Sequence, residues 1–261
     1  MIDIHSHILP AVDDGANTIT EALKIAKEAE EQGVNHVIAT PHYVDPNDAL
    51  TADVINKKVV SLQEELDDSD IDINILPGAE VYINPKLGQE VEKGRVCSLN
   101  NSRYILLELP FKKLPSFVNN VIYDLKVLGY TPVISHPERY TYISSDPNIL
   151  YNLVKEGVYA QMNAGSLMGR YGSRVKETAK TLLKNRLIHL IGSDVHSSEG
   201  RTVCLKQGMT EIKKEIGQER VNYFKENARA VIDDEKLTKL IPAIQKNKTF
   251  FSKLKSIISF G

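Results

Sequence analysis

Apolar and polar positions follow a repeating order along this chain. Short apolar runs alternate with longer segments in which apolar residues recur every three or four positions. The short runs indicate buried strands, and the longer spacing indicates amphipathic helices. The expected strands cover residues 1–7, 36–42, 71–81, 104–109, 132–137, 159–164 and 187–194. Strands that alternate with helices favour an α/β fold with a parallel sheet. We therefore expect a closed or nearly closed (β/α)7 barrel, with an open doubly wound sheet as the alternative.

Capping residues support the helices between these strands. Thr18 followed by Glu21 forms a capping box, and Gly33 ends that helix. Asp146-Pro147 is an N-cap followed by proline in the first turn. Further helices are expected at about 52–66, at 117–128 and around 175–184, and helices should fill the chain beyond residue 194.

Residues that can bind a metal ion occur where the expected strands end. His5 and His7 are two apart on the first strand, so both side chains point to the same face. Chemistry in barrels gathers at the carboxyl ends of the strands. The expected strand ends and the first loop supply nine candidate ligands: His5, His7, Asp14, His42, Glu80, Glu108, His136, Asp194 and His196. Only the sixth strand lacks such a residue and ends at Asn163.

The number and type of these candidates indicate a multinuclear centre. Imidazole and carboxylate ligands without thiolate suit Zn, Mn or Fe(II) rather than a structural cysteine site. Nine ligands are too many for one ion, so two or three ions with a bridging carboxylate are expected. Such a site stabilises the attacking and leaving oxygens in phosphate ester hydrolysis and lowers the pKa of a bridging water.

Two arginines stand near these candidates in the sequence. Arg139 follows His136 by three residues, and Arg201 follows His196 by five. A guanidinium group matches phosphate oxygens bidentately, so both are candidate phosphate-binding residues. The remaining histidines, His36 and His189, lie at strand starts or interiors and are interpreted as structural.

Composition and charge exclude several other classes of protein. The chain has 261 residues, a net charge of −2 and two cysteines, which indicates neither a nucleic-acid-binding protein nor a disulfide scaffold. The start of the chain has no signal-peptide pattern, and no apolar run approaches the roughly 18 residues of a membrane span. A cytoplasmic location is expected.

A second phosphatase motif competes with the metal site. Cys97 and Arg103 have the Cys-x5-Arg spacing of cysteine-based tyrosine phosphatases. That chemistry needs an activated thiolate at a helix N-terminus and a glycine-bearing loop around the phosphate. The segment between Cys97 and Arg103 contains no glycine and leads into an expected strand. We therefore expect Cys97 to have no catalytic role.

Seven segments, taken in order, resemble the polymerase and histidinol phosphatase (PHP) superfamily. They are Asp3-Ile-His-Ser-His7, Asp13-Asp14-Gly15, Ala39-Thr-Pro-His42, Gly78-Ala-Glu80, Leu107-Glu108, Ser135-His-Pro-Glu-Arg139 and Gly192-Ser-Asp-Val-His196. More narrowly, the chain resembles the manganese-dependent protein-tyrosine phosphatases of bacterial capsule and exopolysaccharide operons. No expected ligand position departs from the pattern.

The resemblance implies a distorted (β/α)7 TIM-like barrel of the PHP type, with up to three metal ions at the carboxyl ends of the strands. By this similarity His5, His7, Glu80 and Asp194 hold the first ion, and Glu80 bridges to a second that Glu108 and His136 complete. Asp14, His42 and His196 hold the third. Manganese is the implied metal, with Fe, Zn, Co or Mg possible in its place. Arg139 and Arg201 match phosphate-contacting arginines.

The implied reaction is hydrolysis of phosphotyrosine, and the implied partner is a tyrosine-phosphorylated protein such as a bacterial tyrosine kinase. The alternative is a small-molecule phosphomonoesterase such as a histidinol-phosphatase. A single phosphatase domain over residues 1–261 is expected. From residue 236 to 261 the chain carries six lysines and no acidic residue, and Phe250, Leu254, Ile257 and Ile258 recur at helical spacing. This basic amphipathic tail either packs on the barrel or contacts an anionic membrane surface or a second subunit.

Overall fold

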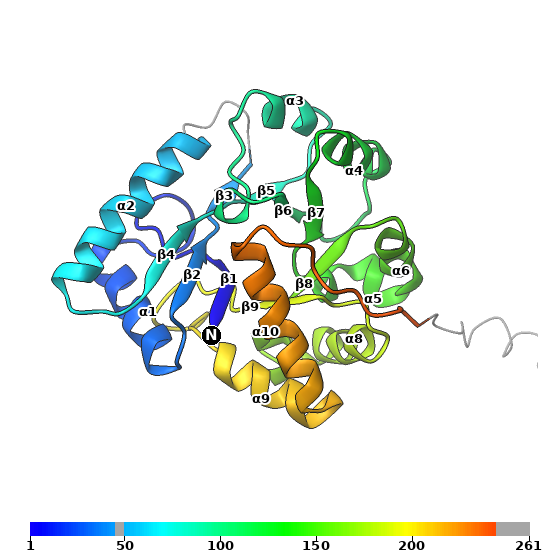
Figure 1. Ribbon diagram of the computed structural model, residues 1–261. Coiled ribbons are helices and arrows are strands. Elements are labelled where there is room, and N and C mark those ends of the chain that lie inside the picture. Colours follow the sequence, from blue (N-terminus) through cyan, green and yellow to red (C-terminus); the bar gives the residue numbers. More distant parts are fainter. Residues whose placement is uncertain (45–49, 244–261) are drawn as a thin grey trace, which may run out of the picture.

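A ring of parallel strands surrounded by helices forms the structure, a computed structural model that describes residues 1–44 and 50–243 (Figure 1). One sheet has the order β1-β2-β4, and the other has the order β3-β5-β6-β7-β8-β9. Every paired strand in these ranges is parallel to its neighbour. The strands are β1 (Ile2–Ser6), β2 (His36–Ala39), β3 (His42–Tyr43), β4 (Asn74–Pro77), β5 (Glu80–Tyr82), β6 (Tyr104–Glu108), β7 (Thr131–Ile134), β8 (Tyr159–Asn163) and β9 (Leu190–Gly192).

Two strands expected to be continuous are each broken in two, which corrects the sequence-based prediction. The expected strand 36–42 divides into β2 and β3 around Thr40 and Pro41, and the expected strand 71–81 divides into β4 and β5 around Gly78. Pro41 has no backbone N–H and cannot donate to the ladder, although its carbonyl accepts from the N–H of Glu80 over 3.0 Å. The register is the same on both sides of the breaks, with Ala39 opposite Pro77 and His42 opposite Glu80. Each broken pair therefore occupies one strand position of the ring.

The ring closes between its last strand and its first. The backbone N–H of Asp194 donates to the carbonyl of His5 over 2.9 Å, and the N–H of His7 donates to the carbonyl of Val195 over 2.9 Å. These bonds form an isolated bridge between Ser6 and Val195 rather than a full ladder. This irregular closure produces the distorted barrel of seven strand positions that the sequence predicts for the described ranges.

Helices cover the outside of the ring, and the predicted first helix begins with the predicted cap. The side chain of Thr18 accepts a hydrogen bond from the N–H of Glu21, and the Glu21 carboxylate accepts one from Asn17. The helices are α1 (Ile19–Glu31), α2 (Ala52–Asp68), α3 (Leu87–Glu92), α4 (Val118–Val127), α5 (Thr141–Ser145), α6 (Asn148–Lys155), α7 (Ala164–Met168), α8 (Ser173–Lys184), α9 (Leu205–Ile216) and α10 (Gln218–Ile232), with short 3-10 turns η1 (Leu99–Asn101) and η2 (Pro137–Arg139). None of the described helices is long and apolar enough to cross a bilayer.

The last helix, α10, covers one end of the barrel. A core cluster inside the ring joins buried side chains of the strands to Ala228 and Val231 of α10. In Figure 1 this helix crosses in front of β1 and β9, and it contacts both. The strand residues of the cluster are Ile4, Ile38, Tyr104, Leu106, Val133, Tyr159 and Leu190. Because α10 occupies the end at which the strands begin, the opposite end is left for polar chemistry.

The chain beyond α10 is not helical as far as residue 243, which corrects the expectation of helices up to the C-terminus. The hydroxyl of Tyr104 donates to the carbonyl of Glu235 and accepts from the N–H of Leu237. The ammonium group of Lys239 donates to the carbonyl of Val154 over 2.6 Å, so this lysine lies against the protein. The predicted amphipathic stripe of Phe250, Leu254, Ile257 and Ile258 lies outside the described residues.

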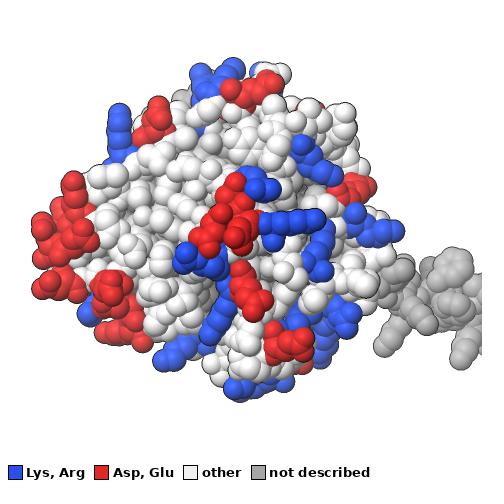
Figure 2. All heavy atoms as spheres, viewed as in Figure 1, with Lys and Arg blue, Asp and Glu red and all other residues white. Residues whose placement is uncertain are grey.

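Charges of both signs are mixed on the face that carries α10. Figure 2 shows this face, where lysine and arginine side chains lie among aspartate and glutamate rather than gathering into a basic stripe. This mixture agrees with the small net charge of −2.

Candidate metal centre

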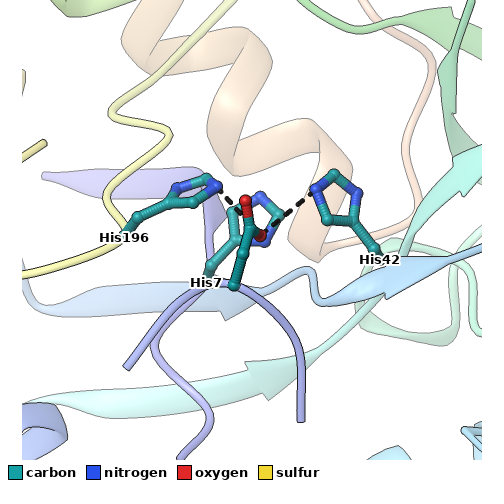
Figure 3. Close-up of side chains that lie close together, drawn as sticks. His7, His42 and His196 are labelled. Carbon is teal, nitrogen blue, oxygen red and sulfur yellow. Dashed lines mark ion pairs between the residues drawn. The ribbon is translucent and has the colours of Figure 1, made fainter. Parts of the chain in front are cut away.

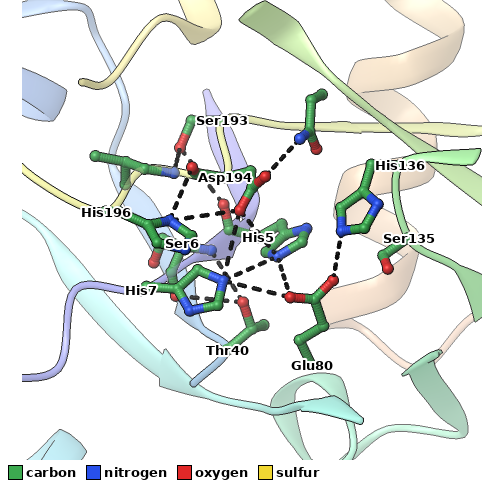
Figure 4. Close-up of polar contacts among 12 residues, drawn as sticks. His5, Ser6, His7, Thr40, Glu80, Ser135, His136, Ser193, Asp194 and His196 are labelled. Atoms are coloured by element: carbon green, nitrogen blue, oxygen red, sulfur yellow. Dashed lines mark hydrogen bonds and ion pairs between the residues drawn. The ribbon is translucent and has the colours of Figure 1, made fainter. Parts of the chain in front are cut away.

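The nine candidate ligands converge at the carboxyl ends of the strands. Most are buried, and the Asp14 side chain is 63% exposed. Within each of three groups, one ligand atom from every residue lies within 4.8 Å of the others. The groups are His5, His7 and Glu80; His42, Glu80 and Glu108; and His7, Asp14, His42 and His196. His136 and Asp194 lie among these groups, as Figure 4 shows.

His5 in β1 and His7 directly after it aim at the same two carboxylates. The Nε2 atoms of His5 and His7 lie 3.3 and 3.5 Å from Oε2 of Glu80. The same two atoms each lie 3.5 Å from Oδ1 of Asp194. This arrangement follows from strand periodicity, because residues two apart share a face. It matches the set that the resemblance implies for the first ion.

Glu80 lies at the centre of the cluster. Its Oε1 is 2.8 Å from Nε2 of His136, and its Oε2 is 3.3 Å from Nδ1 of His42. Glu108 lies beside the same two rings, at 3.7 Å from His136 and 3.9 Å from His42. The Glu80 carboxylate therefore has imidazole nitrogens on several sides, as a carboxylate that bridges two metal ions requires.

The exposed side of the cluster is formed by Asp14 with two imidazoles. Oδ1 of Asp14 lies 3.4 Å from Nε2 of His42 and 3.4 Å from Nε2 of His196. The ring of His7 packs against that of His196 with centroids 3.9 Å apart (Figure 3). The other nitrogen of His42 faces Glu80, so this imidazole lies between two of the groups.

The electrostatics of the cluster suit cations. Burial and then the charge of Glu80 raise the pKa of Glu108 to about 8, because two carboxylates share a dry site. Burial and then the neighbouring His7 lower the pKa of His196 to about 3, which leaves a neutral imidazole with a free lone pair. Oε1 of Glu80, Nδ1 of His42 and Oδ1 of Asp194 are buried, and each lies within 3.5 Å of another candidate ligand. These donor atoms fit metal ions of the expected type.

The backbone is arranged to bring these side chains together. His136 and Asp194 have positive φ angles of 29° and 55°, a region that side chains other than glycine adopt rarely. Such conformations concentrate at functional sites. Gly192 lets β1 and β9 approach each other, because a Cβ atom there would lie 2.6 Å from Cβ of His5.

Asp13, which the sequence analysis did not select, orients two of the candidates. Its Oδ2 lies 2.7 Å from Nδ1 of His7 and accepts from the backbone N–H of His42 over 3.0 Å. Burial would raise the pKa of Asp13, but the bond with His7 outweighs it and lowers this pKa to about 2. A carboxylate behind a ligating histidine fixes the ring orientation and the tautomer. The sequence signal was the pair of adjacent acidic residues, of which only Asp14 was a candidate ligand.

The sixth strand position, β8, supplies amides instead of ligands. Oε1 of Gln161 lies 3.0 Å from Nδ1 of His5, and Nε2 of Gln161 donates to Oδ1 of Asn163. Nδ2 of Asn163 in turn donates to Oδ2 of Asp194 over 2.5 Å. The two amides therefore link two candidate ligands. The sequence signal was present, because both are polar residues two apart at the end of a buried strand.

Both candidate phosphate-binding arginines reach the same carboxylate. Nη1 of Arg139 lies 3.1 Å from Oδ2 of Asp194, and Nη2 of Arg201 lies 2.5 Å from that atom. The Arg139 guanidinium also lies over two aromatic rings, at 4.9 Å from the Phe111 centroid and 4.8 Å from the Tyr171 centroid. The guanidinium groups are therefore beside the cluster and partly exposed to solvent.

Comparison with known proteins places this geometry in a family. Residues 1–233 match the family described as capsular polysaccharide synthesis, CpsB/CapC. The chain belongs to the CpsB/CapC family. This confirms the resemblance to the phosphatases of capsule operons that the motifs indicated.

Relatives of this CpsB/CapC protein match it over nearly their whole length. The tyrosine-protein phosphatase YwqE of Bacillus subtilis (strain 168) is 36% identical and covers 96% of this chain and 99% of its own. The putative tyrosine-protein phosphatase CapC of Staphylococcus aureus is 31% identical, covering 97% and 100%.

A solved structure supports the same relationship. It comes from work on YwqE of Bacillus subtilis and CpsB of Streptococcus pneumoniae, described as unique metal-dependent tyrosine phosphatases. It superposes with a TM-score of 0.91 at 35% identity, over 95% of this chain and 100% of that one. A lactonase of Listeria monocytogenes superposes at a TM-score of 0.53 and 12% identity over 90% and 92% of the two chains, which shows a shared fold alone.

Cys97, His36 and His189, which the sequence analysis set apart from the candidate ligands, lie in structural settings in this CpsB/CapC protein. Cys97 is buried, and burial raises the pKa of its thiol to about 12, so a thiolate nucleophile is not available. Nδ1 of His189 accepts from the backbone N–H of Ala160 over 3.1 Å, and His36 lies at the start of β2. These settings agree with the roles that the sequence suggested for the three residues.

Proposed function

We propose that this protein is a metal-dependent tyrosine-protein phosphatase that hydrolyses phosphotyrosine in proteins. One observation supports the proposal above all: nine ligand-type side chains meet at one end of the barrel beside two arginines. The relative YwqE, which matches over almost the whole chain, is named a tyrosine-protein phosphatase, and this supports the substrate class.

The candidate ligands divide into three sets in this proposal. His5, His7, Glu80 and Asp194 would hold one ion, and Glu80 would share in a second with Glu108 and His136. Asp14, His42 and His196 would hold the third. When bound, the ions act as Lewis acids toward phosphate oxygens and lower the pKa of water. Asp13 and Gln161 hold the rings of His7 and His5, so that Nε2 of each ring faces the carboxylates.

Arg139 and Arg201 bind the phosphate group of the substrate in this proposal. Both guanidinium groups lie on Oδ2 of Asp194, next to the candidate ligands. A guanidinium group pairs with phosphate oxygens through parallel N–H donors and supplies orientation as well as charge. The two arginines would therefore hold the phosphoryl group while the phenolate leaves. A phenol has a pKa near 10, so its anion leaves more readily than an alkoxide.

The proposal extends to metal, partner and location. Manganese, with up to three ions, is proposed, and Fe, Zn, Co or Mg can take its place at such a donor set. The proposed substrate is a bacterial tyrosine kinase or another tyrosine-phosphorylated protein of capsule or exopolysaccharide synthesis. A cytoplasmic location is proposed because both cysteines are free thiols in the structure.

Parallel assays of two substrates test the proposal. Phosphate release from a phosphotyrosine peptide and from histidinol phosphate is measured side by side, after chelator treatment and after addition of manganese. Manganese-dependent hydrolysis that favours the peptide supports the proposal. A preference for histidinol phosphate would identify a small-molecule phosphatase instead, and peptide hydrolysis that survives the chelator would exclude the metal centre.

A further inference from the structure

We infer that Phe111 contacts the aromatic ring of the substrate and so determines specificity for aryl phosphates. The inference rests on the proposed function, because it names the residue of the same site that would contact the phenyl ring of phosphotyrosine. The sequence analysis did not select Phe111, since an apolar residue in a loop carries no signal of its own.

The position of Phe111 is set by the strand before it. Glu108, the last residue of β6, is a candidate ligand, and Phe111 follows three residues later. The backbone carbonyl of Phe111 accepts from the N–H of Thr141 over 2.9 Å and from its hydroxyl over 3.1 Å. These two bonds hold the loop against the start of α5, so the side chain occupies a defined place at the mouth of the barrel.

The ring of Phe111 lies directly beside the cluster. It is nearly parallel to the imidazole of His136, with an interplanar angle of 7° and centroids 5.8 Å apart. The guanidinium carbon of Arg139 lies 4.9 Å from the Phe111 centroid. One apolar ring therefore adjoins both a candidate metal ligand and a candidate phosphate-binding residue.

Phe111 is more exposed to solvent than the neighbouring ring of Tyr140. It is 38% exposed, whereas Tyr140, whose ring is 5.7 Å away, is fully buried. The large apolar side chains that are exposed within residues 1–44 and 50–243 are Val44, Val60, Phe111, Tyr123, Val127 and Ile241. Within that set only Phe111 has a ring contact with a candidate ligand. Exposure of a phenyl ring at this point leaves apolar surface available to a ligand.

The chemistry of a phosphotyrosine places its ring close to this surface. The first ring carbon is two bonds from phosphorus, through the ester oxygen. If Arg139 holds the phosphate oxygens, the substrate ring must therefore begin within a few ångströms of the groups that Arg139 touches. Aromatic rings pair in offset or edge-to-face geometry with centroids 4.5–7 Å apart. Arg139 touches the rings of Phe111 and Tyr171, and Phe111 is the more exposed of the two.

The test compares ligands with and without a ring. Phe111→Leu, Phe111→Tyr and a control, Tyr123→Leu, are assayed with manganese on a phosphotyrosine peptide, and inorganic phosphate serves as a competitive inhibitor without a ring. Tyr123 is 68% exposed on α4 and makes a matched aromatic-to-leucine change. Metal content and thermal unfolding are measured for each variant.

We expect Phe111→Leu to lower kcat/KM for the peptide roughly tenfold, mainly through KM, since this is the scale of an aromatic pair. The inhibition constant of inorganic phosphate should stay within twofold, and Phe111→Tyr and Tyr123→Leu should match the parent.

Two results would overturn the inference while the proposed function stands. One is an unchanged KM for the peptide in Phe111→Leu. The other is an equal weakening of peptide and inorganic phosphate, with or without metal loss, because Phe111 would then merely hold His136 and Arg139 in place. A parent protein that releases no phosphate from the peptide would instead overturn the proposed function, and this inference with it.

Discussion

Replacement of Asp13 by asparagine tests whether a residue behind the cluster controls the candidate ligands. The Asp13 carboxylate contacts Nδ1 of His7 through Oδ2 at 2.7 Å, and accepts from the backbone N–H of Gly15 through Oδ1 at 2.9 Å. Asparagine keeps the shape but removes the charge and one acceptor. The amide must then point its NH2 group toward His7 or toward the backbone donors.

The size of the effect follows from this geometry. A hydrogen bond that involves a charged group contributes about 1.5–3 kcal/mol. Asp13 holds its charge at neutral pH, because the bond with His7 lowers its pKa to about 2 against the effect of burial. Loss of the charged bond frees the His7 ring to rotate or change tautomer. We expect Asp13→Asn to lower metal affinity or turnover roughly 10- to 100-fold, as for other residues behind metal ligands.

The assay measures manganese binding and phosphotyrosine-peptide hydrolysis over a range of manganese concentrations. Part of the lost turnover should return at high manganese, because the donor atoms themselves remain. Asp233→Asn is the matched control, since Asp233, the residue after α10, pairs with the exposed Arg229 of that helix at 2.6 Å. Exposed pairs contribute little, so this control should match the parent in metal binding and turnover.

The reasoning would be refuted by a folded Asp13→Asn variant that binds manganese and turns over peptide within twofold of the parent. Equal losses in Asp13→Asn and Asp233→Asn would also refute it, because a general effect of removing negative charge would then explain the result. Thermal unfolding of both variants shows whether the fold is intact.

Four further predictions concern other parts of the protein. Glu80→Ala should bind fewer ions by elemental analysis and lose roughly 10³-fold or more in turnover; full metal occupancy would refute the bridging role. Arg139→Ala and Arg201→Ala should each lower kcat/KM roughly 10²-fold with metal content intact, and lysine should restore only part of it; unchanged kinetics would make both ordinary surface residues. Cys97→Ser should turn over within a few-fold of the parent while a chelator abolishes activity, since burial raises the thiol pKa to about 12; an inactive but folded variant would restore the thiol mechanism. Burial and then Lys239 lower the pKa of His189 to about 3, so the unfolded chain binds a proton below about pH 6.5 that the folded protein does not. His189 should therefore reduce the free energy of unfolding by up to about 1.4 kcal/mol per pH unit as pH falls from 6.5 toward 3, and His189→Asn should remove that slope in urea titrations; an unchanged slope would contradict this assignment.

Local patterns in the sequence were sufficient for the type of fold and most of the candidate ligands. Strand periodicity placed His5 and His7 on one face, and the structure aims both at Glu80 and Asp194. Parallel strands bring their carboxyl ends to one side of a barrel, so ligand-type residues at strand ends predicted a cluster without any distance information. The capping box at Thr18 likewise predicted where α1 begins.

Only the tertiary structure decided how strands pair in detail and which residues support the ligands. The register that the two broken strands keep across Pro41 and Gly78 depends on their pairing with each other, and α10 covers the barrel end through contacts with strands far away in sequence. Asp13 and Gln161 can orient candidate ligands only because folding places each against a histidine ring. Gln161 is 156 residues from His5 in the sequence. Periodicity reports the face on which a side chain lies, whereas hydrogen bonds, burial and ring contacts depend on segments that meet only in the folded chain. Phe111 shows the same limit, since its exposed ring gains a role only from His136 and Arg139 beside it.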